Sequence, residues 1–259
     1  MIQGMMAKPD IKSIPEFAIV VPVRNEVESV GPLIDEIIIA FNERRYEVII
    51  IDDGSDDGTG DILADLEMRH QSLHIITHNC AKGQSTAIVS GIRAAKATII
   101  ITMDGDGQND PADAPKLLNR FIELGGGDHI MIVGHRINRR DTLLKRFASK
   151  VANVVRSNLL KDATPDTGCG LKVFSRQAFI EMPAFDHMHR FLPALMIRAG
   201  GKVLSIPVNH RIRAYGVSKY GLWNRLWVGI IDLLGMMWLT RRTTNVKPQK
   251  VGSTQGKKI

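Results

Sequence analysis

The sequence predicts an α/β fold in which helices cover both faces of a mostly parallel, doubly wound sheet. Five short apolar runs, rich in β-branched residues, end at turn residues, which is typical of strands buried on both faces. Helix-like stretches separate these runs, and such alternation favours a parallel sheet. The chain has 259 residues, of which 44% are hydrophobic, so it suits one large domain with a sizeable core.

The expected elements follow one another along the first half of the chain. We expect strands at Phe17–Val21, Val48–Ile51, Ile75–Ile76, Ala97–Met103 and Ile130–Val133. We expect helices at Ser29–Asn42, Gly58–Arg69, Gln84–Ala95 and Ala112–Leu124. Ser29 and Thr59 are residue types that cap the amino ends of helices, and both are candidates for that role.

Polar residues follow each expected strand at the point where it ends. They lie at Arg24–Glu26, Asp52–Asp53, Asn79–Gly83, Asp104–Gln108 and His135–Arg136. Ligands of open α/β sheets bind beyond the carboxyl ends of the strands. A single polar turn is usually a helix cap, but a series at successive strand ends is hard to explain by chance. We therefore expect these segments to converge on one crevice.

The segment Asp104–Gln108 (DGDGQ) carries the sharpest chemical signal in the chain. Two carboxylates two residues apart on a loop can face the same cavity, and the intervening glycines let the backbone turn. Hard divalent cations such as Mg²⁺ or Mn²⁺ take oxygen ligands from one or two carboxylates and from substrate phosphates. A solvated acidic turn is the alternative. The position between an apolar run and the helix-start signal Asn109–Pro111 favours a metal site.

A second acidic segment, Asp52–Thr59 (DDGSDDGT), follows the second expected strand. A carboxylate there can accept hydrogen bonds from a nucleobase or a ribose, while the later residues open the next helix. The spacing does not fit a calcium-binding EF-hand loop, because no glutamate stands at the last ligand position. We expect some of these aspartates to cap the turn and one or two to bind a ligand.

The segment 136–161 is strongly basic. It carries eight basic residues opposed only by Asp141, and its apolar residues recur at helical spacing. The basic residues are Arg136, Arg139, Arg140, Lys145, Arg146, Lys150, Arg156 and Lys161. An ordinary surface helix would show the same pattern. The position just after a strand of the expected site favours a helix that presents cations to a lipid phosphate.

The carboxyl-terminal region combines an apolar segment with a basic tail. The net charge of the chain is +7, and residues 241–259 contribute six basic and no acidic residues. Leu222–Leu239 precedes this tail and is interrupted by Arg225 and Asp232. It is slightly shorter than the ~20 apolar residues of a spanning helix, so we expect a helix in the membrane interface with the tail on lipid headgroups, and no nucleic-acid partner. The alternative is a helix packed on the domain, followed by a disordered tail.

Cysteine usage and the amino-terminal segment bear on the compartment. Cys80 and Cys169 lie far apart in the sequence, which favours a reducing compartment and offers no disulfide or zinc framework. The first 14 residues contain no apolar run, so we expect no secretory signal. Together with the carboxyl-terminal region, these features predict a protein at the cytoplasmic face of a membrane.

Four segments in a fixed order resemble the nucleotide-sugar domain of family-2 glycosyltransferases. They are VPVRNE from Val21, IIIDDGSDDGT from Ile49, HNCAKG from His78 and MDGDGQNDP from Met103. The set is far more specific than any one segment, and the likeness covers residues 17–136.

Later segments resemble the polyprenyl-phosphate branch of that family. They are GHR at Gly134–Arg136, the basic helix around Ser149 and Asn153, and RAYGVSKYG at Arg213–Gly221. This branch includes dolichol-phosphate mannose synthase and its bacterial undecaprenyl-phosphate relatives. The resemblance implies a GT-A domain over residues 17–221. Residues 1–16 would then be an extension, 222–240 a membrane-interface helix and 241–259 a basic tail.

The resemblance implies a set of residues at the donor nucleoside. They are Pro22, Arg24, Glu26, Asp52, Asp53 and Lys82. Position 24 is often aromatic in the family, so the arginine here leaves the base contact and the identity of the nucleotide open.

The resemblance also implies residues around the reacting groups. Asp104 would face the donor ribose or sugar, and Asp106 and Gln108 would be ligands of the Mg²⁺ or Mn²⁺ that bridges the diphosphate. Arg213 and Lys219 would close over phosphates. The implied acceptor-phosphate residues are Arg136, Arg146 and Ser149, and the implied catalytic set is Asp104, Asp106, Arg136 and Arg213.

The implied reaction is an inverting transfer of a sugar from a UDP- or GDP-linked donor to a polyprenyl phosphate. A phosphate acceptor is already ionised at neutral pH and, unlike a sugar hydroxyl, needs no strong general base. Asp166, Asp186 and His189 are the candidates for a base, and the sequence does not place them.

Three alternatives stand beside this interpretation. A soluble family-2 enzyme acting on a saccharide or small-molecule hydroxyl would need a base and no apolar carboxyl terminus. A nucleotidyltransferase is disfavoured, because no glycine-rich basic loop follows the first strand. A partner protein with a decayed site is disfavoured by the complete acidic set. The sugar, the lipid chain length and the oligomeric state stay open.

Overall fold

The structure is a computed structural model that describes residues 14–137, 156, 159–160, 162, 164–211 and 222–242, with the backbone alone described for 222–228. The first elements are β1 (Phe17–Val23), α1 (Val30–Ala40), β2 (Tyr46–Asp52), α2 (Thr59–Arg69), β3 (Leu73–Thr77), α3 (Gln84–Ala94), β4 (Ile99–Thr102), the 3₁₀ helix η2 (Pro111–Asp113), α4 (Ala114–Glu123) and β5 (Ile130–Arg136). The later elements are β6 (Lys172–Ser175), α6 (Arg176–Ile180), η3 (Met188–Arg190), α7 (Leu192–Arg198), β7 (Lys202–Val208) and α8 (Leu222–Thr240). All expected strands and helices of the first half are confirmed, with small differences at their ends.

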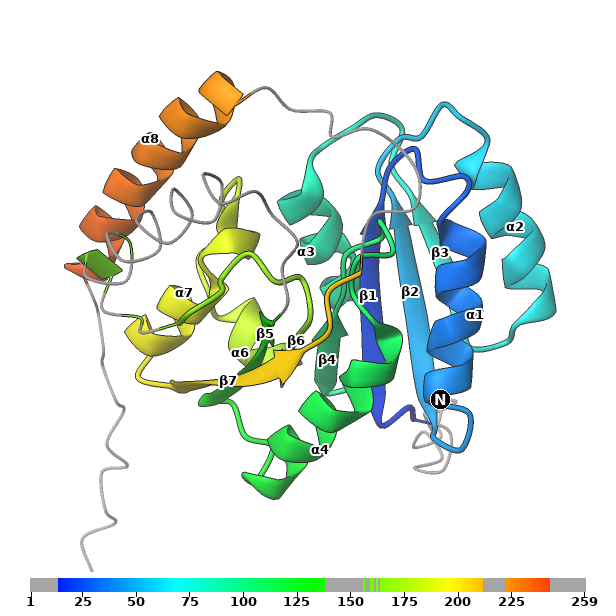
Figure 1. The fold of residues 1–259 in the computed structure, drawn as a ribbon, viewed down its shortest axis with the longest axis horizontal. Coiled ribbons are helices and arrows are strands. Elements are labelled where there is room, and N and C mark those ends of the chain that lie inside the picture. Colours follow the sequence, from blue (N-terminus) through cyan, green and yellow to red (C-terminus); the bar gives the residue numbers. More distant parts are fainter. Residues whose placement is uncertain are drawn as a thin grey trace, which may run out of the picture.

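Seven strands form one sheet in the order β3-β2-β1-β4-β6-β5-β7. β1 pairs in parallel with β2 and β4, and β2 pairs in parallel with β3. β6 is antiparallel to both of its neighbours, β4 and β5, whereas β5 and β7 are parallel. The carboxyl ends of the parallel strands therefore share one edge of the sheet, and the amino end of β6 joins them there (Figure 1).

Helices cover both faces of the sheet, as the fold class predicts. Ile19 and Val21 of β1 belong to a buried cluster that includes residues of α1, α2 and α4. Ala18 and Val20 belong to a second cluster that includes residues of α3, α6, α7 and α8. Successive side chains of a strand point to opposite faces, so β1 contributes to both clusters. Burial of each large aliphatic side chain stabilises the fold by roughly 1.5–3 kcal/mol, which makes β1 a rigid base for the loop that follows it.

The helix caps differ from the expectation. Gly58, with a left-handed φ of 90°, precedes α2, and Thr59 is the first helical residue, so the prediction of Thr59 as an N-cap is wrong. The Thr59 hydroxyl instead accepts the Glu26 N–H at 3.0 Å. Ser29 does precede α1, but its side chain makes no capping bond and donates to Glu26 Oε2 at 2.8 Å. These hydroxyl groups are thus used to hold the loop after β1.

Two strands of the sheet have no counterpart among the expected elements. β6 has four residues and begins with a lysine, and most residues of β7 are exposed or partly exposed. Neither shows the continuous apolar run that marks a buried strand. The antiparallel position of β6 makes the sheet mixed, within the mostly parallel class that the sequence predicts.

α8 packs on the domain through one face only. Met236 is 1% exposed, Leu233 packs in the same cluster, and Arg198 Nε donates to the Leu239 carbonyl oxygen at 3.1 Å. The outer face exposes Ile230, Ile231, Leu234 and Trp238. Within the described parts of the chain, no helix is both long and apolar enough to cross a bilayer. The helix therefore packs on the domain, as the alternative interpretation of this segment expected. Its outer face is apolar, as an interfacial helix requires.

Candidate active site

The candidate site lies at the carboxyl edge of the sheet, where β1 and β4 are neighbours. The chain runs from β1 outward to β2 and β3 and then returns to β4 on the other side of β1, which creates the switch point where α/β folds bind ligands. A Cβ added to Gly105 would lie 2.7 Å from the Pro22 carbonyl oxygen and 2.5 Å from Val23 Cγ1. Only glycine allows this approach, so the segments after β1 and β4 meet as predicted.

The loop Asp104–Gln108 is held by its neighbours. Asn109 is 2% exposed, and its Oδ1 accepts the Asp104 N–H at 2.9 Å. Asp106 Oδ1 accepts the Gln108 N–H at 3.1 Å. From the start of α3, Gln84 Nε2 donates to Asp104 Oδ1 at 2.9 Å. The loop thus presents two carboxylates and one amide from a defined backbone.

The side chains of this loop fit a hard divalent cation. Asp104, Asp106 and Gln108 supply oxygen donors, and Mg²⁺ takes one or two carboxylates while substrate phosphates complete its shell. Among the residues that the structure describes, no three His, Cys, Asp or Glu side chains gather into a metal site.

The start of β6 closes the site from the other side. The Lys172 ammonium donates to the Cys169 carbonyl oxygen, and Thr102 Oγ1 donates to the Gly170 carbonyl oxygen at 2.8 Å. A Cβ on Gly170 would lie 2.3 Å from the Asp104 carboxylate. A larger residue here would displace the Asp104 side chain, because the turn packs directly on the loop that carries the carboxylates.

Arg136, at the end of β5, is bound by Asp166. Its Nε donates to Oδ2 at 2.7 Å and its Nη2 donates to Oδ1 at 2.8 Å. Burial lowers the pKa of Arg136, but the hydrogen bonds and the charge of Asp166 outweigh burial and raise that pKa above its ordinary value. Arg136 is therefore a permanently charged guanidinium with a fixed orientation.

Charges of both signs lie close together in this site, where Lys172 is buried and Asp104 and Arg136 are partly buried. Burial and the neighbouring Asp106 raise the pKa of Asp104, while Lys172 and Arg136 act in the opposite direction. Burial lowers the pKa of Lys172, against the attraction of nearby negative groups. Burial also raises the pKa of Cys169 to about 11, so its thiol stays protonated and acts as a packing group.

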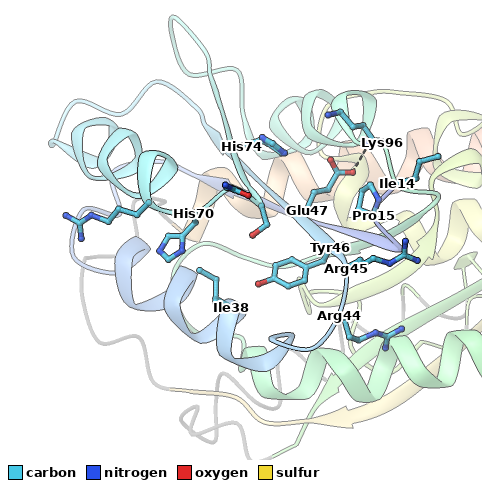
Figure 2. A pocket seen from close by; sticks show the side chains of 13 residues that line it. Ile14, Pro15, Ile38, Arg44, Arg45, Tyr46, Glu47, His70, His74 and Lys96 are labelled. Carbon is cyan, nitrogen blue, oxygen red and sulfur yellow. Dashed lines mark hydrogen bonds between the residues drawn. The ribbon is translucent and has the colours of Figure 1, made fainter. Parts of the chain in front are cut away.

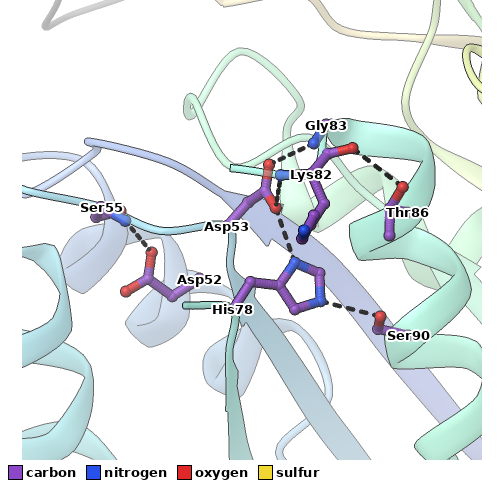
Figure 3. Close-up of polar contacts among 8 residues, drawn as sticks. All are labelled: Asp52, Asp53, Ser55, His78, Lys82, Gly83, Thr86 and Ser90. Carbon is purple, nitrogen blue, oxygen red and sulfur yellow. Dashed lines mark hydrogen bonds and ion pairs between the residues drawn. The ribbon is translucent and has the colours of Figure 1, made fainter. Parts of the chain in front are cut away.

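Asp53, at the end of β2, organises the loop that follows β3 (Figure 3). His78 Nδ1 lies 2.8 Å from its Oδ1, and the N–H groups of Lys82 and Gly83 donate to its two oxygens at 2.8 Å each. His78 Nε2 lies 3.0 Å from Ser90 Oγ on α3. Burial raises the pKa of Asp53, but these hydrogen bonds outweigh burial and lower that pKa. Asp53 is thus an anchor of the loop, and its contact with the nucleoside stays a prediction.

The other residues expected at the nucleoside lie at the same edge of the sheet. Asp52 is buried, and its Oδ1 accepts the Ser55 N–H at 2.9 Å, so it shapes the turn after β2. Pro22 and Glu26 are partly buried, and Arg24 is exposed. Their roles in donor binding stay predictions.

The three candidates for a general base are placed by the structure. Asp166 is ion-paired as described above, and Asp186 Oδ1 accepts the His187 N–H at 2.8 Å. His189 Nδ1 lies 2.8 Å from Ser85 Oγ, and burial, reinforced by nearby cations, lowers the pKa of His189 to about 3. An imidazole of that pKa is too weak a base to take a proton from a hydroxyl group near neutral pH.

Several expected residues lie outside the described residues. They are Arg146, Ser149, Arg213 and Lys219. Of the basic residues in segment 136–161, Arg136 and Arg156 are described, and Arg156 pairs with the buried Asp162.

Three residues of the site carry no sequence-based prediction: Gln84, Gly170 and Lys172. Gln84 is far in sequence from its partner Asp104, and only the sheet topology brings them together. A signal existed for Lys172, because a lysine between Leu171 and Val173 is unusual in a buried strand.

A cavity of about 580 Å³ lies at the opposite edge of the sheet, near the amino ends of β1, β2 and β3 (Figure 2). Arg44 and Arg45, which line it, pair with Glu16 at 3.2 Å and 3.4 Å. Beside them, the Lys96 N–H donates to Glu47 Oε1 at 2.7 Å. This cavity is separate from the predicted motifs and plays no part in the candidate site.

Known proteins that resemble the chain are sugar transferases. Residues 18–182 match the family model described as glycosyl transferase family 2. The chain is 35% identical over 232 residues to a dodecaprenyl-phosphate galacturonate synthase of Rhizobium johnstonii, covering 87% of this chain and 68% of that protein. It is 31% identical over 216 residues to an undecaprenyl-phosphate 4-deoxy-4-formamido-L-arabinose transferase of Edwardsiella ictaluri, covering 82% and 65%. The chain thus spans about two thirds of the length of these relatives.

Solved structures share the fold. A glucosyl-3-phosphoglycerate synthase from Mycobacterium tuberculosis, in complex with Mn²⁺, UDP and glucosyl-3-phosphoglycerate, has a TM-score of 0.62 at 14% identity, covering 88% of this chain and 81% of that chain. A mannosyltransferase from Pyrobaculum calidifontis, in complex with GDP-Man and Mn²⁺, has a TM-score of 0.61 at 19% identity, covering 88% and 64%. At these identities the likeness shows the fold alone. The family model and the 35% identical relative go further: the chain belongs to glycosyl transferase family 2.

Proposed function

We propose that the protein transfers a sugar, with inversion, from a UDP- or GDP-linked donor to a polyprenyl phosphate at a membrane surface. The observation that carries the proposal is the meeting of the loop Asp104–Gln108 with the end of β1 at the switch point of the sheet. Relatives named for dodecaprenyl phosphate and undecaprenyl phosphate support the acceptor. Structural neighbours that hold UDP or GDP-Man with Mn²⁺ support the donor class.

On the donor side, Asp106 and Gln108 would hold Mg²⁺ or Mn²⁺, and Asp104 would face the ribose or the sugar. When bound, the cation would neutralise charge that develops on the departing nucleoside diphosphate. The loop anchored by Asp53 would lie along the nucleoside, and Arg213 and Lys219 would contact phosphates from the segment beyond β7.

On the acceptor side, a phosphate oxygen would attack the anomeric carbon opposite the leaving diphosphate. The second pKa of a phosphate monoester is about 6, so the nucleophile is ionised without help from a base. Asp166 and His189 are already engaged by Arg136 and Ser85, which favours a phosphate over a hydroxyl acceptor. Arg136 would bind the acceptor phosphate together with Arg146 and Ser149.

The carboxyl-terminal helix would bring the site to the lipid. The exposed face of α8 would lie in the headgroup region, with the basic residues of 241–259 on anionic lipids. The two cysteines are not joined in a disulfide, which supports a reaction at the cytoplasmic face of the membrane, where disulfides are rare.

The proposal is tested with a panel of radiolabelled UDP- and GDP-sugars and polyprenyl phosphate, with and without Mn²⁺, by following label into the organic phase. We expect Mn²⁺-dependent labelling of the lipid by the wild type. Asp106→Asn should reduce it by more than the ~10–100-fold that loss of an outer-shell metal partner costs. The matched control is Asp61→Asn, which removes an exposed carboxylate on α2.

Two outcomes would count against the proposal. Normal transfer by Asp106→Asn would contradict the proposed role of Asp106 as a metal ligand. Label that appears only in a water-soluble saccharide would exclude the lipid acceptor and support the soluble family-2 alternative.

A further inference from the structure

The segment Phe185–Phe191 links two parts of the molecule that are far apart in sequence. His189 in this segment touches the start of α3, beside the loop Asp104–Gln108, and His187 touches α8. The inference below rests on the proposed function, because it uses α8 as the helix that meets the membrane.

The contact with the donor site is made by His189. Its Nδ1 lies 2.8 Å from Ser85 Oγ, and its backbone N–H donates to the same oxygen at 3.2 Å. Ser85 is 2% exposed and lies between Gly83, bound by Asp53, and the helical turn that follows. The preceding residue, Gln84, donates to Asp104 Oδ1 at 2.9 Å. Movement of His189 would therefore shift Ser85, and with it both the loop anchored by Asp53 and the loop Asp104–Gln108.

The contact with α8 is made by His187. Its Nδ1 lies 3.0 Å from Asp232 Oδ2, and the Asp232 side chain is only 16% exposed. His187 has a left-handed φ of 61°, which is unusual for a residue other than glycine. The adjacent Met188 and Phe191 are buried in the same cluster as Met236 of α8. The segment thus contacts α8 through His187 and Asp232, whose atoms lie close without forming a hydrogen bond, and through apolar packing.

The outer face of α8 begins next to the contact between His187 and Asp232. Ile231 directly precedes Asp232 and is 67% exposed, and Leu234 is 60% exposed. If lipid covers Ile231 and Leu234, it fixes the position of Asp232 on the inner face, and with it the position of His187. The contact of His187 with α8 and the contact of His189 with Ser85 are therefore expected to become ordered together.

We propose that His187 and His189 are positioning residues that tie the donor site to α8, so that a lipid surface under α8 stabilises the donor-binding geometry. Neither residue needs to touch the reacting atoms. Binding of nucleotide and binding of membrane then strengthen each other, and by linkage each raises the affinity of the other by the same factor.

The test measures nucleotide binding to the full chain without any acceptor. UDP and GDP are titrated with Mn²⁺, with and without phosphatidylcholine vesicles that contain phosphatidylglycerol. For the nucleotide that binds, we expect vesicles to tighten binding about fivefold or more, the lower end of typical couplings between sites. The same nucleotide should tighten vesicle binding by an equal factor in co-sedimentation.

Two variants separate coupling from folding. Asp232→Asn keeps the shape of the side chain and removes its charge, and His187→Asn removes the imidazole while tolerating a positive φ. We expect both to bind vesicles and to lose the gain in nucleotide affinity. Ser85→Ala removes the hydroxyl that contacts His189, so it should also lose the gain in nucleotide affinity. The control, Asp65→Asn, breaks an exposed ion pair with Arg69 on α2 and should keep the gain.

The proposal is overturned if vesicles leave the nucleotide affinity of the wild type unchanged, or if His187→Asn and Asp232→Asn keep the full gain. The outcome is independent of the proposed acceptor. A wild type that shows the coupling but transfers no sugar to polyprenyl phosphate would contradict the proposed function and leave the coupling standing. A wild type that transfers sugar to polyprenyl phosphate but shows no coupling would support the proposed function and overturn the coupling.

Discussion

Asp104, a residue of the candidate site, carries a charge that the folded protein disfavours. Burial and Asp106 raise its pKa in the folded protein, so its ionisation is less favourable there than in the unfolded chain. This penalty is present at pH values above the raised pKa and is absent below the ordinary value of 3.8. The fold therefore carries an electrostatic cost at neutral pH that a neutral side chain would remove.

We expect Asp104→Asn to raise the Tm of the metal-free protein at pH 7, because the substitution removes a carboxylate whose ionisation the fold disfavours. The gain should shrink as the pH falls toward 4, where the wild-type carboxyl takes up its proton. Calorimetry in EDTA measures both effects, and sugar transfer should be lost. A lower Tm at pH 7 would show that the ionised carboxylate stabilises the fold.

Gly170 marks the other tight point of the site. Because its Cβ would lie 2.3 Å from the Asp104 carboxylate, we expect Gly170→Ala to destabilise the fold by about 1–3 kcal/mol through overpacking and to impair transfer strongly. Urea unfolding and the transfer assay measure these effects. Gly127→Ala is the control, because a Cβ there meets no atom within 4 Å. Equal behaviour of the two variants would contradict the close approach.

At the scale of elements, the outer face of α8 is the feature that should bind lipid. We expect the double variant Ile231→Glu and Leu234→Glu to weaken binding to anionic vesicles about tenfold or more, because each large apolar side chain contributes roughly 1.5–3 kcal/mol when it is removed from water. Co-sedimentation measures this. The control places glutamates at Ile39 on α1 and Met68 on α2, which are 75% and 81% exposed. Similar losses in both variants would point to a general charge effect.

The elements also show where prediction from sequence stops. The apolar runs of β1, β2 and β4 are continuous and end in acidic turns, so both the strands and their motifs are readable from the sequence. β6 is short, begins with Lys172 and depends on its two neighbouring strands for its conformation. Because β6 is antiparallel to its neighbours, its amino end lies at the site. The periodicity of the sequence does not indicate this orientation. The pairs Gln84–Asp104 and Ser85–His189 likewise exist only through the tertiary fold.

At the scale of the whole molecule, the charge distribution predicts how membrane binding responds to salt. Residues 241–259 carry six basic and no acidic residues, and each basic residue near an anionic surface contributes about 1 kcal/mol at most. We expect vesicle binding to fall steeply as ionic strength rises from low values toward 1 M, where the screening length is about 3 Å. A variant that ends at residue 242 should bind more weakly and respond less to salt. Binding that does not respond to salt in the full chain would exclude an electrostatic role for the tail.

The antiparallel insertion of β6 has a consequence for the order of events during synthesis. Thr102 of β4 and Gly170 are 68 residues apart in sequence, yet they are joined by a hydrogen bond in the site. Closing such long loops is slow compared with forming local contacts. A nascent chain that has released β1 to β4 from the ribosome therefore still lacks the turn that supports Asp104. We expect the first four strands to assemble early, and the candidate site to be complete only after the residues of β6 have emerged and inserted.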